Sequence, residues 1–287
     1  MPHPALLALF GGIVLSGLSP ILVRLSPVDP GATAFWRLLM AAALMLCFAR
    51  FSVRLPLRVV GAVGVAGFLL AGDLVLWNMA IVSTTVLEAT LLVMLYPLLV
   101  AAIEIFWLKR PLGWPLVAGG LIAFAGAAIM TLGPTAGQSS LYGNALALIA
   151  AFFYAGSLLI IARYCRGHPI PAITFWQMLS AALFSLPTWA WEDHFIPRSA
   201  EDWRFMTIYG VVTFGGYLLI NVGLTRIAAS IAAILGYAQP VIATLIAYFL
   251  LAEMPSHVAM LGGAVVIAGL LLAGTVGRSP KPAASEA

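Results

Sequence analysis

The sequence predicts an all-α polytopic membrane protein whose ten transmembrane helices form two inverted five-helix repeats. Three observations lead to this fold class: the composition, the length of the apolar segments and an internal repeat. Of the 287 residues, 63% are hydrophobic and only 8% are charged, whereas a soluble domain carries about 25% charged residues. A soluble fold of this size could not bury so much apolar surface, so the chain is expected in a lipid bilayer.

Ten apolar segments follow one another with short connections between them. Each is bounded by proline, glycine or charged residues and approaches the roughly 20 residues that cross a bilayer core. The segments cover residues 5–23, 32–49, 59–78, 86–107, 114–132, 141–162, 172–191, 205–224, 228–251 and 256–275. The first is too long for the apolar core of a signal peptide and is interpreted as a retained span. The connections are too short to hold a soluble domain.

Basic residues concentrate on alternate connections. If the N-terminus is cytoplasmic, ten Lys and Arg residues lie in cytoplasmic segments and three lie on the opposite side. The ten are Arg50, Arg54, Arg58, Lys109, Arg110, Arg163, Arg166, Arg226, Arg278 and Lys281, and the three are Arg24, Arg198 and Arg204. Because Lys and Arg in short loops favour the cytoplasmic side, both termini are expected in the cytoplasm. This topology, rather than a nucleic-acid partner, explains the net charge of +4.

The two halves of the chain resemble one another at an offset of 143 residues. The aligned pairs include Asn78 with Asn221, Pro97 with Pro240, Phe106 with Phe249, and Gly119-Gly120 with Gly262-Gly263. The repeat predicts one unit over residues 1–137, a second over 138–276 and a disordered cytoplasmic tail over 277–287. Since five spans per half is an odd number, the two units enter the membrane from opposite sides. Inverted repeats are typical of transporters that work by alternating access; a duplication that only enlarges the bundle is the alternative.

Several short motifs occur in a fixed order along these spans. They are Phe35-Trp36-Arg37 in the second, Tyr96-Pro97 in the fourth, Gln239-Pro240 in the ninth, and the glycines of the fifth and tenth. With this five-plus-five plan, the chain resembles the ten-helix EamA-type branch of the drug/metabolite transporter (DMT) superfamily over nearly its whole length. The resemblance implies a bacterial inner-membrane exporter of metabolites, similar to the YddG-like amino-acid exporters. One departure is Lys109-Arg110-Pro111, where family members often carry an acidic residue.

Two prolines fall near the middle of predicted spans. Pro97 and Pro240 lack the N–H that would bond the carbonyl four residues earlier, so each is expected to kink its helix. Irregular backbone at this depth is tolerated where it lines a cavity, and transporter sites lie there. Tyr96 and Gln239, beside the prolines, are therefore predicted to bind substrate. A packing kink, with both side chains bonded to neighbouring helices, is the alternative.

Aromatic residues at a similar depth extend this predicted site. Tyr154, Tyr217 and Tyr237 would add aromatic faces with hydroxyl groups, which suit a small amphipathic solute. Trp77 and Asn78, at the end of the third span, are further candidates. Anchoring at the membrane interface is the alternative for Trp77. A helix cap or an interhelical hydrogen bond is the alternative for Asn78.

Four ionisable residues lie within the apolar spans, where an unpaired charge costs at least about 2.5 kcal/mol. Arg37, Asp73 and Glu88 are expected in the outer third of the membrane, where Arg37 would pair with Asp73 or with Glu88. Such a group would act as an outer gate or a proton-linked switch, and a static structural pair is the alternative. Their counterparts in the repeat are not ionisable. Glu104 is expected to reach water at the cytoplasmic end of its span.

The repeat and the midplane residues together predict a secondary active transporter. The resemblance implies export of small metabolites, foremost aromatic or other neutral amino acids. A drug, sugar or nucleotide derivative as the substrate, or a channel in place of a carrier, are the alternatives. An enzyme is not expected, because the four histidines are terminal or in loops and hydrolase and zinc-protease motifs do not occur.

The expected partners follow from the same features. They are a small-molecule substrate, protons as a coupling ion, and the lipid bilayer, and neither a cofactor nor a metal is expected. The glycine-rich fifth and tenth spans have small faces that allow close helix contact. These faces are interpreted as core packing or as the seam of a homodimer.

Overall fold

The computed structural model describes residues 4–84, 86–130, 140–251 and 256–275. Within these ranges every regular element is helical, which confirms the predicted all-α class. Eight helical stretches of 18 or more residues are long and apolar enough to cross a membrane, and two shorter apolar helices, Trp114–Met130 and His257–Ala273, accompany them. The protein is therefore a polytopic membrane protein. The predicted tail over 277–287 and the predicted boundary between residues 137 and 138 lie outside the described residues.

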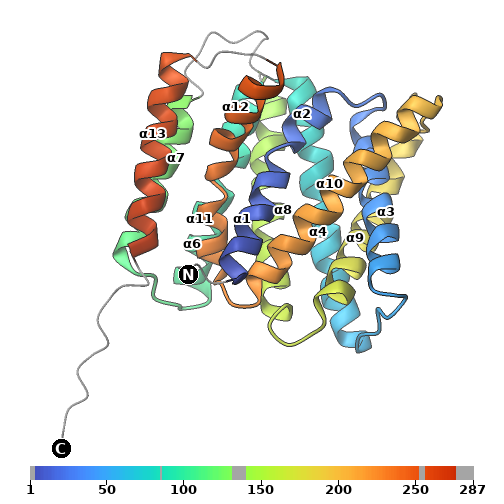
Figure 1. Cartoon of the computed structure of the whole chain (residues 1–287), viewed down its shortest axis with the longest axis horizontal. Coiled ribbons are helices and arrows are strands. Elements are labelled where there is room, and N and C mark those ends of the chain that lie inside the picture. Colours follow the sequence, from blue (N-terminus) through green and yellow to red (C-terminus); the bar gives the residue numbers. More distant parts are fainter. Residues whose placement is uncertain (1–3, 85, 131–139, 252–255, 276–287) are drawn as a thin grey trace, which may run out of the picture.

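The helices are numbered in chain order as Figure 1 labels them. They are α1 (Pro4–Ser16), α2 (Ser19–Arg24), α3 (Pro30–Phe48), α4 (Leu57–Ser83), α5 (Val86–Val93), α6 (Tyr96–Ala102), the π-helix η1 (Ile103–Trp107), α7 (Trp114–Met130), α8 (Leu141–Tyr164), α9 (Ile170–Ser185), the 3₁₀-helix η2 (Leu186–Ala190), α10 (Ala200–Leu224), α11 (Ala229–Leu235), α12 (Ala238–Leu251) and α13 (His257–Ala273). The ten expected spans correspond to α1–α2, α3, α4, α5–η1, α7, α8, α9–η2, α10, α11–α12 and α13.

Three spans are broken, and a proline follows each break. The first breaks before Pro20, the fourth before Pro97 and the ninth before Pro240. Because proline has no backbone N–H, the helix loses one backbone hydrogen bond at each site. The backbone tightens there: the amide of Leu95 bonds the carbonyl three residues earlier at 3.1 Å, and the amide of Tyr237 does the same at 3.1 Å.

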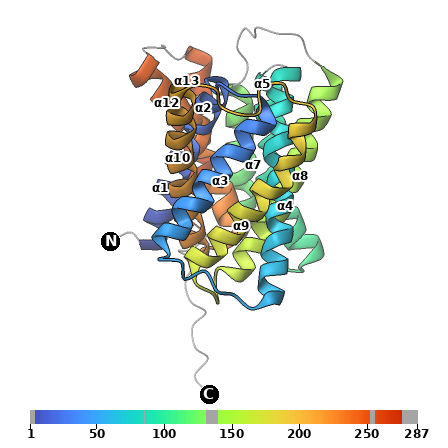
Figure 2. The same ribbon diagram turned by 90° about the vertical axis from the view of Figure 1, so that its right-hand side faces the viewer.

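The spans of the two chain halves interleave rather than forming two separate bundles. Helix α1 packs on α10, and α4 packs on α8 and α9. Helix α3 lies against α9 and α10, which Figure 2 shows from the side of α3. Helices α7 and α13 form a pair at the opposite edge of the molecule (Figure 1).

Glycines allow α7 and α13 to pack closely. A Cβ atom on Gly119 would lie 2.5 Å from the carbonyl oxygen of Gly269, and one on Gly126 would lie 2.8 Å from that of Gly262. Only a hydrogen atom fits at such a distance, so backbone meets backbone along this seam. The glycine faces that suggested core packing or a homodimer are therefore covered within the chain.

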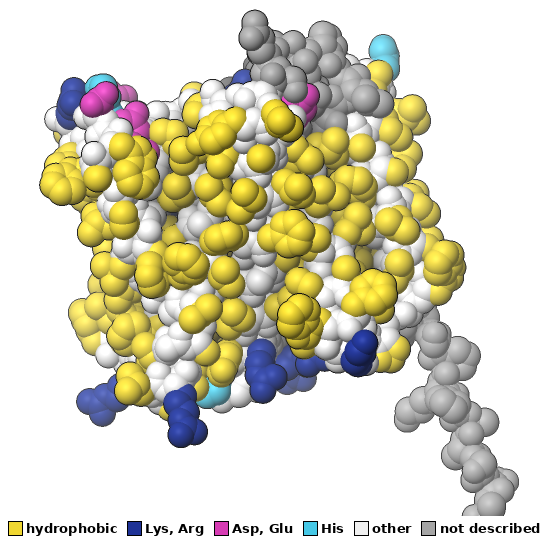
Figure 3. All heavy atoms as spheres, turned by 180° about the vertical axis from the view of Figure 1, so that it is seen from behind, with side chains coloured by type: hydrophobic (Ala, Val, Ile, Leu, Met, Phe, Trp, Pro, Cys, Tyr) yellow, Lys and Arg dark blue, Asp and Glu magenta, His cyan; other side chains and the backbone are white. Residues whose placement is uncertain are grey.

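Charged side chains gather at the two ends of the bundle and leave an apolar belt between them. Figure 3 shows most Lys and Arg at one end, and at the other end the Asp and Glu side chains together with a few basic ones. We call the first the basic end; it carries Arg50, Arg54, Arg58, Lys109, Arg110, Arg163, Arg166 and Arg226. The second, the acidic end, carries Asp29, Glu192, Asp193, Glu201 and Asp202. An apolar belt between polar ends matches a bilayer core between two aqueous phases.

Candidate functional site

A cavity of about 270 Å³ lies inside the bundle, between its middle and the acidic end. Its wall is built by residues of α1, α2, α3, α4, α5, α6, α8, α10 and α12, so both chain halves contribute. All three broken spans reach it: Pro20, Tyr96 and Pro240 are part of the wall. Non-helical backbone inside a membrane protein is tolerated where it lines such a cavity.

The structure brings most of the predicted site residues to this cavity. Those in its wall are Arg37, Asp73, Trp77, Tyr96, Tyr154, Tyr217, Gln239 and Pro240. Those outside its wall are Asn78, Glu88, Pro97 and Tyr237. The sequence reasoning missed Ser16, Ser19 and Pro20 of the first span, which also line the cavity. Pro20 could have been found, since it interrupts an apolar span as Pro97 and Pro240 do.

Two tyrosines form the aromatic centre of the wall. The rings of Tyr96 and Tyr154 meet edge to face, with centroids 4.6 Å apart and an interplanar angle of 84°. This is a favoured geometry for aromatic pairs. The hydroxyl of Tyr96 reaches the break in the ninth span, where it lies 3.4 Å from the carbonyl oxygen of Ala233. Tyr96 thus connects the fourth and ninth spans.

Tyr237 and Asn78 have other surroundings. Tyr237 is fully buried and its ring packs 6.1 Å from that of Phe124 on α7. Tyr237 lies in the break between α11 and α12, and it is not part of the cavity wall. The side-chain amide of Asn78 donates to the carbonyl of Pro30 at 2.7 Å, which makes an interhelical bond between α4 and α3.

Arg37 does not form the expected ion pair with Asp73. Within the described residues the ion pair that does form joins Arg110 to Glu104. Arg37 instead donates an Nη1 hydrogen bond to the hydroxyl of Tyr209, and its guanidinium carbon lies 4.9 Å from the centre of that ring. The sequence could not indicate this partner, because tyrosine carries no formal charge and Tyr209 is 172 residues away.

Glu88 lies apart from the cavity, at the start of the fourth span. The hydroxyl of Thr84 donates to its carboxylate at 2.8 Å, and the same hydroxyl lies 2.9 Å from Oδ1 of Asn144. Thr84 also accepts a hydrogen bond from the amide of Ser140 at 3.1 Å. These contacts tie the third, fourth and sixth spans together near the acidic end.

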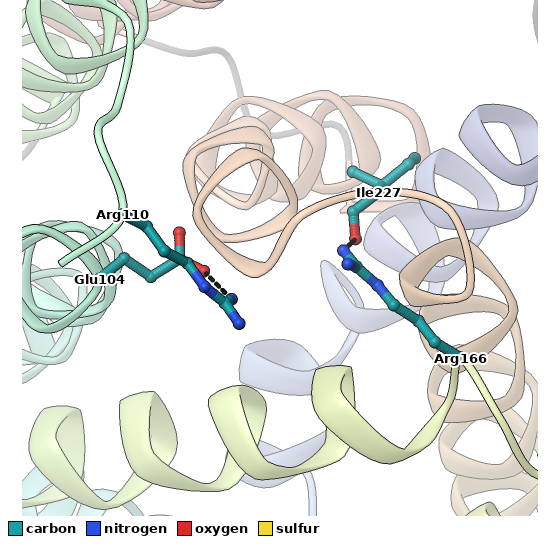
Figure 4. A network of polar contacts seen from close by, with 4 residues as sticks. All are labelled: Glu104, Arg110, Arg166 and Ile227. Carbon is teal, nitrogen blue, oxygen red and sulfur yellow. Dashed lines mark hydrogen bonds and ion pairs between the residues drawn. The ribbon is translucent and has the colours of Figure 1, made fainter. Parts of the chain in front are cut away.

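Glu104 is buried rather than exposed to water. Its side chain is 2% exposed and forms an ion pair with Arg110 at 3.4 Å (Figure 4). The expectation that it reaches water was wrong because the π-helix η1 carries it inward and the chain after the span brings Arg110 back over it. Figure 4 also shows Arg166 donating to the carbonyl of Ile227 at 3.4 Å, across the basic end.

The bundle is tightly packed between the cavity and the basic end. A cluster of buried residues from both chain halves fills this region; its members include Leu9, Ile13, Val63, Val100, Ile161, Leu224 and Ala233. Ile13, Val63 and Val100 are at most 2% exposed. We call this cluster the basic-side seal, because its buried side chains pack between the cavity and the basic end.

The acidic end fixes the position of the helix that carries Arg37. The carboxylate of Glu192 accepts hydrogen bonds from the amides of Gly31 (2.6 Å) and Ala32 (2.8 Å) at the start of α3. A carboxylate at a helix N-terminus satisfies free amides and complements the helix dipole. The indole of Trp36 donates to the carbonyl of Phe195 at 2.7 Å. Loop 191–199 therefore anchors α3.

A helical bundle with broken spans around an internal, mostly apolar cavity with a few polar and charged side chains defines a class: it is a membrane transporter of small molecules. The comparison with protein families makes this more specific. The family described as the EamA-like transporter family matches this chain twice, over residues 3–132 and over residues 141–275. The chain belongs to the EamA-like transporter family.

Curated relatives of this chain are also transporters. An uncharacterised transporter, YdfC of Bacillus subtilis, is 27% identical over 90% of this chain and 86% of its own length. The pseudopaline exporter CntI of Pseudomonas aeruginosa is 24% identical over 91% of this chain and 92% of its own. A probable terminal-alkyne amino-acid exporter of Streptantibioticus cattleyicolor is 26% identical over 71% of this chain and 70% of its own length. A protein crystal structure shares the fold, with a TM-score of 0.82, 21% sequence identity and coverage of 96% of this chain and 97% of that chain.

Proposed function

We propose that this protein is a secondary active transporter that exports small metabolites, foremost aromatic or other neutral amino acids, by alternating access. The observation that carries the proposal is the cavity of about 270 Å³, which is lined by aromatic rings and by side chains of both charge signs and is closed toward the basic end. Ligand sites are usually apolar cavities with a few polar groups that fix the orientation of the ligand.

The packing of α7 and α13 supports an inverted repeat. At the offset of 143, Gly119 corresponds to Gly262 and Met130 corresponds to Ala273. A Cβ on Gly119 would lie 2.5 Å from the amide nitrogen of Ala273, and one on Gly262 would lie 2.5 Å from that of Met130. Each contact is the repeat counterpart of the other, as a two-fold relation between the units 1–137 and 138–276 requires. Inverted repeats that rock about a shared site provide alternating access.

The choice of amino acids rests on the cavity and on relatives. Two relatives are named as exporters, and one of these as a probable exporter of an amino acid. The cavity presents Arg37 and Asp73 together with Tyr96 and Tyr154. Opposite charges beside aromatic faces fit a neutral amino acid better than a sugar or a nucleotide derivative.

Export, coupling and orientation belong to the same proposal. We place the basic end and both termini in the cytoplasm of a bacterium, because Lys and Arg of short loops favour that side. The transporter would then be in a state closed toward the cytoplasm. Of the two acids considered for proton coupling, Asp73 lines the cavity and Glu88 does not. Proton coupling is therefore proposed for Asp73.

Counterflow in proteoliposomes tests this function. Vesicles loaded with one unlabelled amino acid should accumulate the same labelled amino acid transiently, and the flux should saturate. A panel of L-phenylalanine, L-leucine, L-threonine, glucose and uridine, with and without a pH gradient, separates the substrate classes. We expect counterflow with at least one amino acid and a pH-gradient dependence that Asp73→Asn removes.

Three results would contradict parts of the proposal. Flux without counterflow would indicate a channel. Counterflow with glucose or uridine alone would exclude amino acids as the substrate class. Flux that ignores the pH gradient in the wild-type protein would exclude proton coupling while leaving the carrier function intact.

A further inference from the structure

Two buried side chains of opposite charge face the cavity without neutralising one another. Arg37 on α3 is 2% exposed, Asp73 on α4 is 6% exposed, and both belong to the cavity wall. No ion pair joins them in the described part of the chain. Because an unpaired charge at this depth is costly, each is expected to have a role that offsets the cost.

The guanidinium of Arg37 has unused donors. Its Nη1 donates to the hydroxyl of Tyr209, whose ring also lies beneath the guanidinium at 4.9 Å. Its Nε is sealed without an acceptor among the described residues, whereas Nη2 has no hydrogen bond there and is not among the sealed atoms, so Nη2 is the donor that reaches the cavity. Tyr209 is itself fully buried, so it holds Arg37 in place without neutralising its charge. The cation therefore keeps hydrogen bonds for an anionic ligand group.

The carboxylate of Asp73 has unused acceptors. Among the described residues no side chain or backbone amide within hydrogen-bond distance donates to it, yet it does not belong to the polar atoms that are sealed without a partner. Its oxygens therefore open onto the cavity. A buried carboxylate open to a cavity is suited to an ammonium group, which supplies both the opposite charge and hydrogen-bond donors.

The second chain half lacks this arrangement. In the early part of the halves the offset is 140 residues, which pairs Phe35-Trp36 with Phe175-Trp176 and Arg37 with Gln177. The side-chain oxygen of Gln177 accepts a hydrogen bond from Asn221 at 3.1 Å. That position is satisfied within the protein and carries no charge. The two opposite charges, Arg37 and Asp73, are therefore specific to one wall of the cavity. This is expected for a recognition site rather than for a feature of the duplicated scaffold.

We propose that Arg37 and Asp73 are the two poles of a binding site for a zwitterionic α-amino acid. Arg37 binds the α-carboxylate, Asp73 binds the α-ammonium group, and the side chain of the amino acid lies against Tyr96 and Tyr154. Tyr209 is a positioning residue that orients Arg37. This inference rests on the proposed function and identifies the groups that would recognise its substrate.

Competition in the counterflow assay tests the two poles separately. L-phenylalanine carries both charges, L-phenylalaninamide carries only the cation, and 3-phenylpropionate carries only the anion, while all three share one ring. L-leucine, L-leucinamide and 4-methylpentanoate form a second series. In the wild-type protein we expect the zwitterion of a series to inhibit labelled amino-acid counterflow at the lowest concentration.

The variants should then show a crossed pattern. Arg37→Gln, which introduces the residue of the other half, should weaken inhibition by the zwitterion and the anion at least about tenfold and leave the amide within about threefold. Asp73→Asn should weaken inhibition by the zwitterion and by the amide and should leave inhibition by the anion unchanged. Tyr209→Phe keeps the buried ring but removes the hydroxyl that accepts the Arg37 hydrogen bond. It should therefore weaken inhibition by the zwitterion and by the anion a few-fold without affecting inhibition by the amide.

The pattern across three ligands distinguishes recognition from a general loss of folding. Glu201→Gln and Arg204→Gln remove exposed charges from α10 and should leave inhibition by all three ligands unchanged. Equal losses for all three ligands in Tyr209→Phe and in both pole variants would overturn the two-pole site. If wild-type protein shows counterflow with no amino acid, the proposed function fails instead. If it carries amino acids but Arg37→Gln and Asp73→Asn keep the wild-type preference, only the two-pole site is excluded.

Discussion

The hydroxyl group of Tyr96 lies in the break between α11 and α12, at a position that only glycine leaves open. A Cβ atom on Gly236 would collide with this hydroxyl and would lie 2.7 Å from the carbonyl oxygen of Ala233. The contact therefore depends on two residues from different chain halves. It also joins two proline-broken spans at the edge of the cavity.

Gly236→Ala is predicted to destabilise the protein by about 1–3 kcal/mol, because overpacking at a buried contact forces neighbouring atoms to move. Tyr96→Phe removes the hydroxyl, so the double variant should be less damaged than the sum of the two single variants. The measurement is the midpoint of thermal unfolding in detergent, followed by intrinsic fluorescence. Gly61→Ala is the control, since no atom lies within 4 Å of its added Cβ. Strictly additive midpoints would contradict a contact between Tyr96 and Gly236.

Some site residues can be predicted from local chemistry and others cannot. Tyr96 and Gln239 are accessible to prediction because a proline follows each directly. Tyr237 shares their depth, but depth does not determine which face of a broken helix a side chain occupies. The pairing of Arg37 with Tyr209 depends on the packing of α3 against α10, which no local pattern encodes.

At the scale of helices, α7 and α13 are joined by direct backbone contact along their seam. A Cβ atom added to Gly126 would lie 2.5 Å from the amide nitrogen of Val266, and one added to its repeat counterpart Gly269 would lie 2.5 Å from that of Ala123. Backbone atoms cannot swing away as a flexible side chain can. Any added methyl group must therefore push the two helices apart.

Gly126→Ala and Gly269→Ala are predicted to lower stability by similar amounts, about 1–3 kcal/mol each, because the two substitutions are related by the repeat. Gly274→Ala, at the end of α13, has open space around the added Cβ and should be neutral. Thermal unfolding in detergent again gives the comparison. If either seam variant were as stable as Gly274→Ala, the close contact of α7 with α13 would be refuted.

The spans themselves are the most predictable elements, because lipid requires about 20 apolar residues in a row and the chain contains little else. The broken first span was not predicted. The π-helix η1 was not predicted either, since nothing in the apolar stretch Ile103–Trp107 distinguishes it from an α-helix. Its consequence, the burial of Glu104 beneath Arg110, was missed for the same reason.

At the scale of the whole molecule, different contacts hold the bundle together at its basic end and at its acidic end. The basic-side seal is made of residues from both chain halves, so opening the cavity toward that end requires the halves to move relative to each other. At the acidic end, Glu192 and the loop that contains it hold the start of α3. A transport cycle would need to loosen the seal while the residues of the cavity wall stay together.

The side of the membrane that each end of the bundle faces is a separate prediction. Because ten Lys and Arg residues are assigned to one side and three to the other, the basic end is predicted to be cytoplasmic. The test uses single-cysteine variants in which Cys47 and Cys165 are replaced by serine and one cysteine is introduced at Gly167 or Asp193. These positions lie in the connections at the basic and the acidic end respectively.

A membrane-impermeant maleimide should label Asp193→Cys in intact cells and should label Gly167→Cys only after the membrane is permeabilised. The ratio of labelling before and after permeabilisation should be near one for the first variant and near background for the second. The cysteine-free protein is the control for nonspecific labelling. The reversed pattern would place the basic end outside and would contradict the proposed orientation.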